Sequence, residues 1–174
     1  MYNFASIQPT EKLAIECSKE ATTKLYFYNI YGNNATKIKL IAESDLIVEI
    51  EPENLTIKPT RPLKEKPANI SDDTEYLTIP SIDGFVETKF ATIKITVPKE
   101  MKVGKHNLTI TATAEWFAQP TNIIQKRDFD YEVDVVDGKA TVSDASIAIV
   151  ILFILLILLV IVVFLKSEHS TPAS

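Results

Sequence analysis

Hydrophobic and polar residues alternate along three segments of the chain, which is typical of strands that bury one face. The three segments are residues 90–97, 106–116 and 128–136. In the second segment, Leu108, Ile110, Ala112, Ala114 and Trp116 fall on one face, and polar residues fall on the other. The pattern therefore predicts half-buried antiparallel strands.

Six shorter segments have the composition of strands and are separated by turn-rich pieces. They are residues 12–17, 23–31, 36–42, 46–50, 55–58 and 75–79. Phe4 and Ile7 indicate that a first strand begins almost at once, and no segment before Ala145 shows a capped helical period. Seven to nine short strands predict an all-β domain with the architecture of a β-sandwich.

Residues 58–73 interrupt this pattern with three prolines and mixed charge. Proline cannot donate to a strand ladder, so the segment does not fit a central strand. We expect a surface loop that crosses from one sheet to the other.

The alternation gives way to 19 consecutive apolar residues, Ile147 to Leu165. At ~1.5 Å per residue a helix of this length spans roughly 28 Å, close to the ~30 Å hydrocarbon core of a bilayer. We expect a transmembrane helix over residues 145–165, bounded by Asp144 and Lys166 and contacting the lipid bilayer. A sandwich domain over residues 1–137 would precede it, with a juxtamembrane linker over 138–144 and a short tail over 166–174.

Three stretches carry a resemblance to a known family. They read "LYFYNIYGNNATKIKL", "VEIEPENLTIKP" and "ATIKITVPKEMKVGKHNLTITATA". They resemble the Ig-like β-sandwich domain associated with NPCBM modules, which is common in archaeal and bacterial surface proteins. The resemblance covers residues 6 to 136 and implies a single Ig-like antiparallel β-sandwich outside the cell, with no chemistry attached.

Composition and charge narrow the possible functions. The formal charge of -5 over 174 residues, with scattered Lys and Arg, argues against a nucleic-acid partner. Cys17 is the only cysteine, so no intrachain disulfide can form, and its alternating context favours an inert buried thiol. His106 lies beside a turn and His169 lies in the tail, so no catalytic triad is expected. We expect no enzyme, no catalytic residues and no cofactor.

Three other features allow a binding site. Asp128, Asp130, Glu132 and Asp134 form an acidic row, and residues 71–75 read "SDDTE". Same-face residues on a strand are ~6.8 Å apart, so the row spreads its charges along a line, and a solvated face is favoured over a metal site. Tyr26, Tyr28 and Tyr31 can form a sugar- or peptide-binding platform, although aromatic residues are also common in strands and sandwich cores.

Four of the eight asparagines stand in Asn-x-Ser/Thr sequons. They are the candidate N-glycosylation sites Asn34, Asn54, Asn69 and Asn107. Asn34 falls in a predicted turn, Asn69 in the proline-rich segment, and the other two at strand starts. Glycosylation requires that the domain lie outside the cell.

The side of the membrane is indicated by opposing signals. The first residues, "MYNFASIQPTEK", contain no secretory signal, and Lys126, Arg127 and Lys139 outnumber Lys166 as positive charges near the apolar run. Both observations favour a tail-anchored cytoplasmic domain. The sequons and the resemblance favour an extracellular domain, which needs a cleaved signal upstream of Met1.

We therefore expect a non-enzymatic, single-pass membrane glycoprotein of the cell surface. It would present its sandwich to an unknown protein or glycan for adhesion, envelope assembly or as a subunit of a membrane complex. The alternative is a cytoplasmic tail-anchored adaptor that recruits a protein or peptide to the membrane, in the manner of major-sperm-protein-type sandwiches. That family usually has a basic binding face and a coiled coil, and this chain shows neither.

Overall fold

The computed structural model describes residues 4–118 and 121–137, all within one compact unit. Ten strands make up its regular structure. They are β1 (Ala5–Ile7), β2 (Lys12–Glu16), β3 (Glu20–Tyr28), β4 (Thr36–Ser44), β5 (Ile47–Glu51), β6 (Asn54–Ile57), β7 (Thr74–Thr78), β8 (Phe85–Thr96), β9 (Gly104–Ala118) and β10 (Thr121–Val136). The predicted transmembrane helix, its linker and tail, Asp144, Lys166 and His169 lie outside the described residues. Within residues 4–118 and 121–137, no helix is long and apolar enough to cross a membrane.

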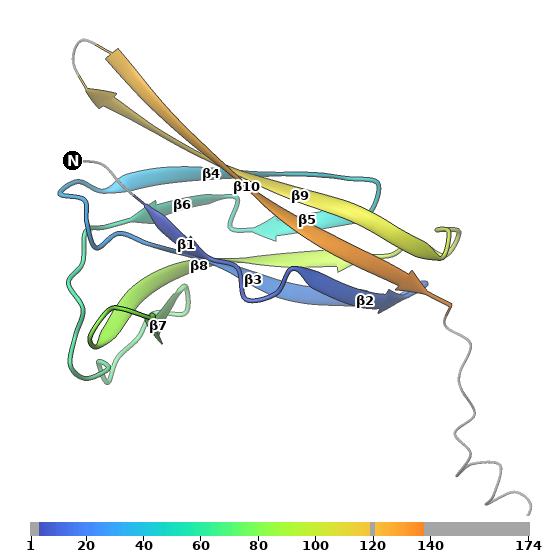
Figure 1. Cartoon of the computed structure of the whole chain (residues 1–174), viewed down its shortest axis with the longest axis horizontal. Helices are drawn as coiled ribbons and strands as arrows, with labels where there is room; N and C mark the ends of the chain where they lie inside the picture. The colour runs from blue at the N-terminus through green and yellow to red at the C-terminus, as the bar shows by residue number, and fades with distance from the viewer. Residues whose placement is uncertain (1–3, 119–120, 138–174) are drawn as a thin grey trace, which may run out of the picture. The chain divides into compact units, whose positions relative to one another are not determined.

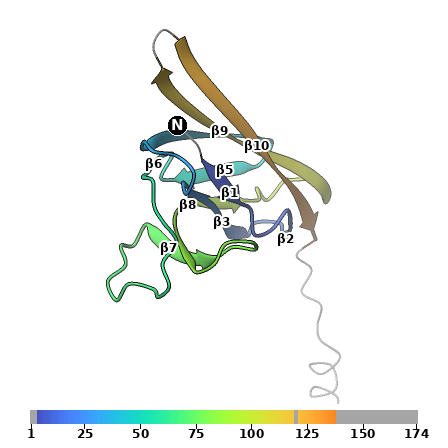
Figure 2. The same cartoon turned by 60° about the vertical axis from the view of Figure 1, so that its left-hand side comes forward.

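The strands form two five-stranded sheets, which confirms the predicted β-sandwich (Figures 1 and 2). Sheet A has the order β1-β3-β8-β5, and β7 also pairs with β8. Lys89 of β8 pairs with Phe27 of β3 and with Thr74 of β7. Because a residue pairs with one neighbour on each side, β7 and β5 share the same edge of β8. Sheet B has the order β2-β10-β9-β4-β6.

The inner faces of the two sheets enclose one apolar core. Alternate residues of the central strands are fully buried, among them Leu25 and Phe27 in β3, Ile93 in β8 and Ile110 in β9. The ring of Phe27 meets the ring of Phe129 from the opposite sheet edge-on at 6.0 Å. Apolar area removed from water contributes roughly 25 cal/mol per Å², so this shared core is the main source of stability.

Two features of the N-terminal strands correct the sequence-based prediction. The described part of the chain has ten strands, where seven to nine were expected, and its first two strands, β1 and β2, lie in different sheets. The sandwich is also not wholly antiparallel, since β2 runs parallel to β10, with Leu13 opposite Val133. Residues 8–11 connect the edge of sheet A to the edge of sheet B. In sheet B, β2 then runs in the same direction as β10.

The crossing loop predicted at residues 58–73 is confirmed, because it connects β6 of sheet B to β7 of sheet A. Leu63 in this loop exchanges two backbone hydrogen bonds with Phe85, beyond the point where β3 leaves β8. Gly84 has φ +100°, and a Cβ there would lie 2.4 Å from the carbonyl oxygen of Leu63. Only glycine permits this approach of the loop to the sheet.

Asn29 ends β3 three residues earlier than predicted and organises the turn into β4. Its side chain is buried; Oδ1 accepts from the Gly32 N–H at 2.7 Å, and Nδ2 donates to the Asn34 carbonyl at 3.0 Å. Its own carbonyl accepts from the Thr60 N–H at 2.9 Å, which ties the turn to the crossing loop. One amide therefore satisfies backbone groups of the turn that water would otherwise have to reach.

We predict that Asn29→Ala lowers the free energy of unfolding by about 1–3 kcal/mol, since it leaves buried turn groups without partners. Asn33→Ala is the control, because Asn33 is exposed in the same turn. Urea unfolding followed by fluorescence would measure both variants. Equal stability of the two variants would show that the Asn29 bonds do not hold the turn.

Candidate functional site

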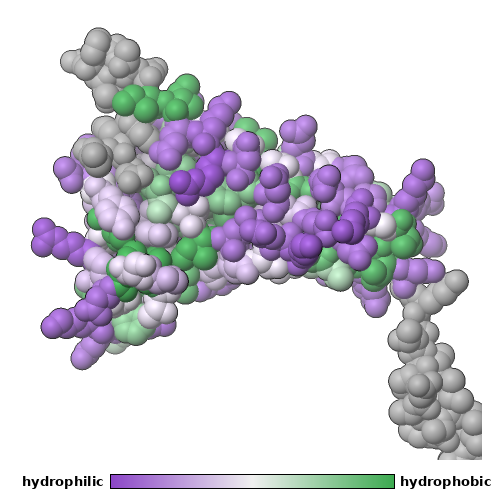
Figure 3. Space-filling model, viewed as in Figure 1, coloured by the Kyte–Doolittle hydropathy of each residue, from purple (hydrophilic) through white to green (hydrophobic). Residues whose placement is uncertain are grey.

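The β9–β10 hairpin extends beyond the rest of the sandwich (Figures 1 and 2). β4 accompanies β9 only up to Glu115, and β2 accompanies β10 only from Glu132 onward. Beyond Glu115 in β9, and before Glu132 in β10, each of these two strands pairs only with the other among the described strands. The projecting end carries two exposed isoleucines, Ile123 at 43% and Ile124 at 56% exposure. Figure 3 shows hydrophobic surface on this hairpin beside hydrophilic side chains.

Among the strands that the structure describes, none pairs with the outer edge of β10 along residues 121–131. Backbone groups of its even-numbered residues face this edge: Glu132 N–H donates to Glu11, and the Asp130 carbonyl accepts from Gln8 Nε2 at 2.8 Å. By the alternation of an antiparallel ladder, Ile124, Lys126 and Asp128 direct their N–H and C=O groups the same way. We call residues 122–128 of β10 the free edge, because no hydrogen-bond partner for these outward groups occurs among the described residues.

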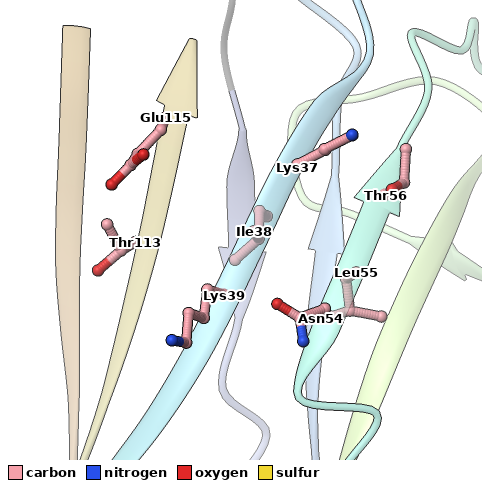
Figure 4. Close-up of a pocket in the computed structure, with 8 residues that line it drawn as sticks. All are labelled: Lys37, Ile38, Lys39, Asn54, Leu55, Thr56, Thr113 and Glu115. Carbon is pink, nitrogen blue, oxygen red and sulfur yellow. The ribbon is translucent and has the colours of Figure 1, made fainter. Parts of the chain in front are cut away.

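The outer face of sheet B next to this edge has a shallow hollow between β4, β6 and β9 (Figure 4). It is lined by two core residues, Ile38 and Leu55, and by six polar residues. The polar residues are Lys37, Lys39, Asn54, Thr56, Thr113 and Glu115.

The charges around the hollow are not matched to one another. Lys37 is opposite Glu115 in the ladder, but no ion pair joins them or involves Lys39 or Lys126 within the described part of the chain. Figure 4 shows the Glu115 carboxylate directed toward β10 and the Lys37 side chain directed toward β6. On β10, the residue opposite Glu115 is Ile124. Glu115 at the hollow is therefore next to Ile124 of the free edge.

The acidic row lies on the outer face of sheet B, and neighbouring side chains engage most of it. Thr111 donates to Asp128 and Thr109 donates to Asp130, each at 2.8 Å. Glu132 forms ion pairs with Lys105 at 3.1 Å and Lys12 at 3.6 Å. The hydrogen bond from Lys105 is the main cause that lowers the pKa of Glu132. No group of three or more His, Cys, Asp or Glu is placed to hold a metal ion in residues 4–118 and 121–137.

The acidic loop at residues 71–75 is organised by its own side chains and by strand β8. Asp73 accepts from Lys89 at 2.6 Å and from Ser71 at 2.7 Å. These two hydrogen bonds lower the pKa of Asp73 to about 2. Glu75 pairs with Lys24, whose ammonium also lies 4.0 Å from the centre of the Phe90 ring.

The three tyrosines do not form a single platform. Tyr26 is 9% exposed on the outer face of sheet A and donates to Glu75 at 3.0 Å. Burial, with help from Glu75, raises its pKa to about 12. Tyr28 is half-buried, whereas Tyr31 is 62% exposed in the turn after β3. The Tyr26 ring packs against the Phe90 ring, with 5.8 Å between centroids. Tyr31 instead lies near Tyr28, whose pKa is raised by burial and then by Tyr31.

All four sequon asparagines are exposed. Asn34 lies in the turn before β4, Asn69 in the crossing loop, Asn54 at the start of β6 and Asn107 in β9. Asn54 and Asn107 both belong to the outer face of sheet B, where Asn54 is opposite Lys39 and Asn107 is opposite Glu132. The use of these sequons stays a prediction.

Cys17 and His106 both have structural partners. Cys17 is half-buried against the core, and its thiol donates weakly to the Met101 carbonyl at 3.8 Å. His106 Nδ1 lies 2.7 Å from the Asp45 carboxylate, and Nε2 lies 2.8 Å from the Lys102 carbonyl. Both partners are acceptors, so the doubly protonated imidazolium satisfies them best. The hydrogen bond to Asp45, followed by that to Lys102, raises the pKa of His106.

The free edge was not predicted from the sequence as a functional feature. The one available signal was the pair Ile123–Ile124, where two adjacent apolar residues break the alternation of the strand. Adjacent strand residues point to opposite faces, so at least one of them had to lie away from the core.

No protein-family model matches the chain, and no curated protein matches it. Among solved structures, similar chains include a family 123 glycoside hydrolase from Clostridium perfringens, at 17% identity and a TM-score of 0.41. That match covers 72% of this chain and 22% of the other. No family is assigned to the chain.

Two further solved structures come from pili and fimbriae. The CsuC–CsuE chaperone and tip adhesion subunit complex of Acinetobacter baumannii matches at 8% identity, with a TM-score of 0.43 and coverage of 83% of this chain and 63% of the other. AggA, the major subunit of aggregative adherence fimbriae type I from Escherichia coli, matches at 8% identity with a TM-score of 0.38, covering 77% and 93%. This chain spans less than two thirds of the length of the first two structures.

We predict that His106 titrates above the usual imidazole pKa of ~6.5. Its folded-state pKa is raised, so its contribution to stability is complete below the unfolded pKa and is lost as pH rises through the folded pKa. Asp45→Asn should lower the pKa of His106 and flatten this loss. Proton NMR titration measures the pKa of His106, with His169 as the internal reference. A pKa of His106 at or below that of His169 would contradict the ion pair.

Proposed function

We propose that the chain is a non-enzymatic, single-pass membrane protein that presents an Ig-like β-sandwich at the cell surface, for adhesion, envelope assembly or as a membrane-complex subunit. The observation that carries the proposal is the projecting β9–β10 hairpin, with exposed isoleucines beside an unpaired strand edge. Exposed apolar residues next to free N–H and C=O groups suit the addition of a partner strand. The sandwich serves as a rigid support for this hairpin.

The strand order supports the Ig-like part of the proposal. In chain order, β1, β3, β4, β6, β7, β8, β9 and β10 take the places A, B, C, C′, D, E, F and G. Immunoglobulin-type sandwiches place A, B, E and D in one sheet and G, F, C and C′ in the other. Here β2 is a second part of the first strand, and β5 is an addition between C and C′.

The membrane part of the proposal rests on the sequence. The apolar run from Ile147 to Leu165 has the length and composition of a bilayer span. β10 ends at Val136, ten residues before this run, so the sandwich would lie near the membrane. The exposure of all four sequon asparagines is compatible with glycans and hence with an outer location.

Protease added to intact cells tests the proposed location. We predict that the sandwich is digested in intact cells, because the proposal places the domain outside. An antibody to the sandwich would follow the loss on immunoblots, with a cytoplasmic protein as the control. Protection in intact cells, followed by digestion after lysis, would instead support the tail-anchored adaptor that the positive charges of Lys126, Arg127 and Lys139 favour.

A second experiment tests the sequons separately. We predict that enzymatic deglycosylation increases the gel mobility of the chain, and that Asn107→Gln removes part of this change. Asn33→Gln is the matched control, since Asn33 is exposed but is followed by Asn34 and Ala35 and so has no sequon. Identical mobility of the wild-type chain before and after treatment would contradict glycosylation while leaving the protease result intact.

A further inference from the structure

The free edge of β10 has defined limits. Toward the C-terminal end, Gln8 already occupies the outward carbonyl of Asp130, and β2 takes over from Glu132. Toward the N-terminal end, the strand begins at Thr121. The even residues 122, 124, 126 and 128 lie between these limits, and Gln125 is their midpoint.

The sequence around Gln125 has a pattern suited to pairing with itself. Residues 123–127 read Ile-Ile-Gln-Lys-Arg, with two apolar residues before the midpoint and two basic residues after it. In an antiparallel pair of identical strands centred on Gln125, Ile124 faces Lys126 of the other copy, and Ile123 faces Arg127. No residue of this pairing has a like charge directly opposite, an arrangement that would be destabilising.

Such pairing would remove the exposed apolar surface of the hairpin. Lys and Arg cover apolar neighbours with their methylene stems while the charged ends stay in water. The stem of Lys126 in one copy would therefore lie over Ile124 of the other, which is 56% exposed in the single chain. Ile123, which is 43% exposed, would face Arg127, whose guanidinium lies against Ser6 and Phe4 of its own chain. The outward N–H and C=O groups of Ile124 and Lys126 would bond each other, as in any antiparallel ladder.

Charge complementarity favours the same register. Ile124 is flanked on β9 by Glu115, whose carboxylate is directed toward β10 (Figure 4). A lysine opposite Ile124 lies two strand spacings, roughly 10 Å, from Glu115, a distance that the two side chains can bridge together. Neither Glu115 nor Lys126 has an ion-pair partner among the described residues.

The geometry points to a second copy of this chain as the partner of the free edge, with the two β10 strands paired antiparallel about Gln125 and sheet B continuous across the dimer. This dimer goes beyond the proposed function, because the pairing requires no membrane. It also directs the C-terminal ends of the two β10 strands away from each other.

Disulfide trapping tests the register. Gln125 would face its own copy in a non-hydrogen-bonded pair with a Cα separation of about 4.5 Å, within the roughly 4.4–6.8 Å that a disulfide requires. The full chain in mild detergent, carrying Cys17→Ala and Gln125→Cys, should form a covalent dimer under mild oxidation. Lys37→Cys in the same background is the control, since Lys37 is exposed on β4. Absence of a dimer with Gln125→Cys, or equal dimer with both, would overturn the inference.

Sedimentation equilibrium of the same detergent-solubilised chain tests the contact without cross-linking. Ile124→Lys should weaken dimerisation at least tenfold, because it places two lysines against each other. Ile41→Lys is the matched control: Ile41 is 53% exposed on the outer face of sheet B, away from the edge, and its change should leave the dimer intact. Both variants should keep the wild-type far-UV circular dichroism spectrum, which shows that they fold.

Two results of this measurement would contradict the proposal. A wild-type chain that stays monomeric at all concentrations would exclude the dimer. A dimer that survives Ile124→Lys unchanged would show that another part of the chain forms the contact. Neither result would bear on the location measured by protease digestion.

Discussion

The packing of two apolar sheet faces against each other is the interaction on which the rest of the structure depends. Ile93 and Ile95 of β8 and Leu108 and Ile110 of β9 are completely removed from water. Every other residue of these strands then points outward, which makes the outer faces polar and mixed in charge. The core therefore leaves the protein two kinds of surface for recognition, the polar outer faces and the strand edges.

Edges are the more selective of these surfaces because their backbone groups need partners. Sheet A and sheet B are each closed in part by the N-terminal segment, in which β1 pairs with β3 and β2 pairs with β10. Arg127 extends this closure, since its guanidinium donates to Ser6 Oγ at 2.7 Å and lies 5.3 Å from the Phe4 ring. The N-terminal segment covers the edge of β10 no further than Arg127, and the edge of the projecting part of β10 stays without a partner strand among the described residues.

The sequence predicted those parts of the fold that cover the core and little of what lies beyond it. Residues 106–116 alternate because one face is buried, and the structure extends this strand by only two residues at each end. Residues 121–127 do not alternate, because they project past the core and nothing selects a buried face. The parallel β2–β10 pair and the contact between Asp45 and His106 join residues far apart in the chain, and no local pattern encodes them.

Glycans and a partner strand can occupy sheet B together. Asn54 lies on β6, three strands from β10, a separation of roughly 14 Å at ~4.8 Å per strand. Asn107 lies on β9 opposite Glu132, where β2 already covers the edge of β10. Sugars at these positions would shield the outer face and its hollow, whereas the backbone groups of residues 122–128 point sideways, in the plane of the sheet. The edge is thus the part of sheet B that stays available for binding when its face is covered.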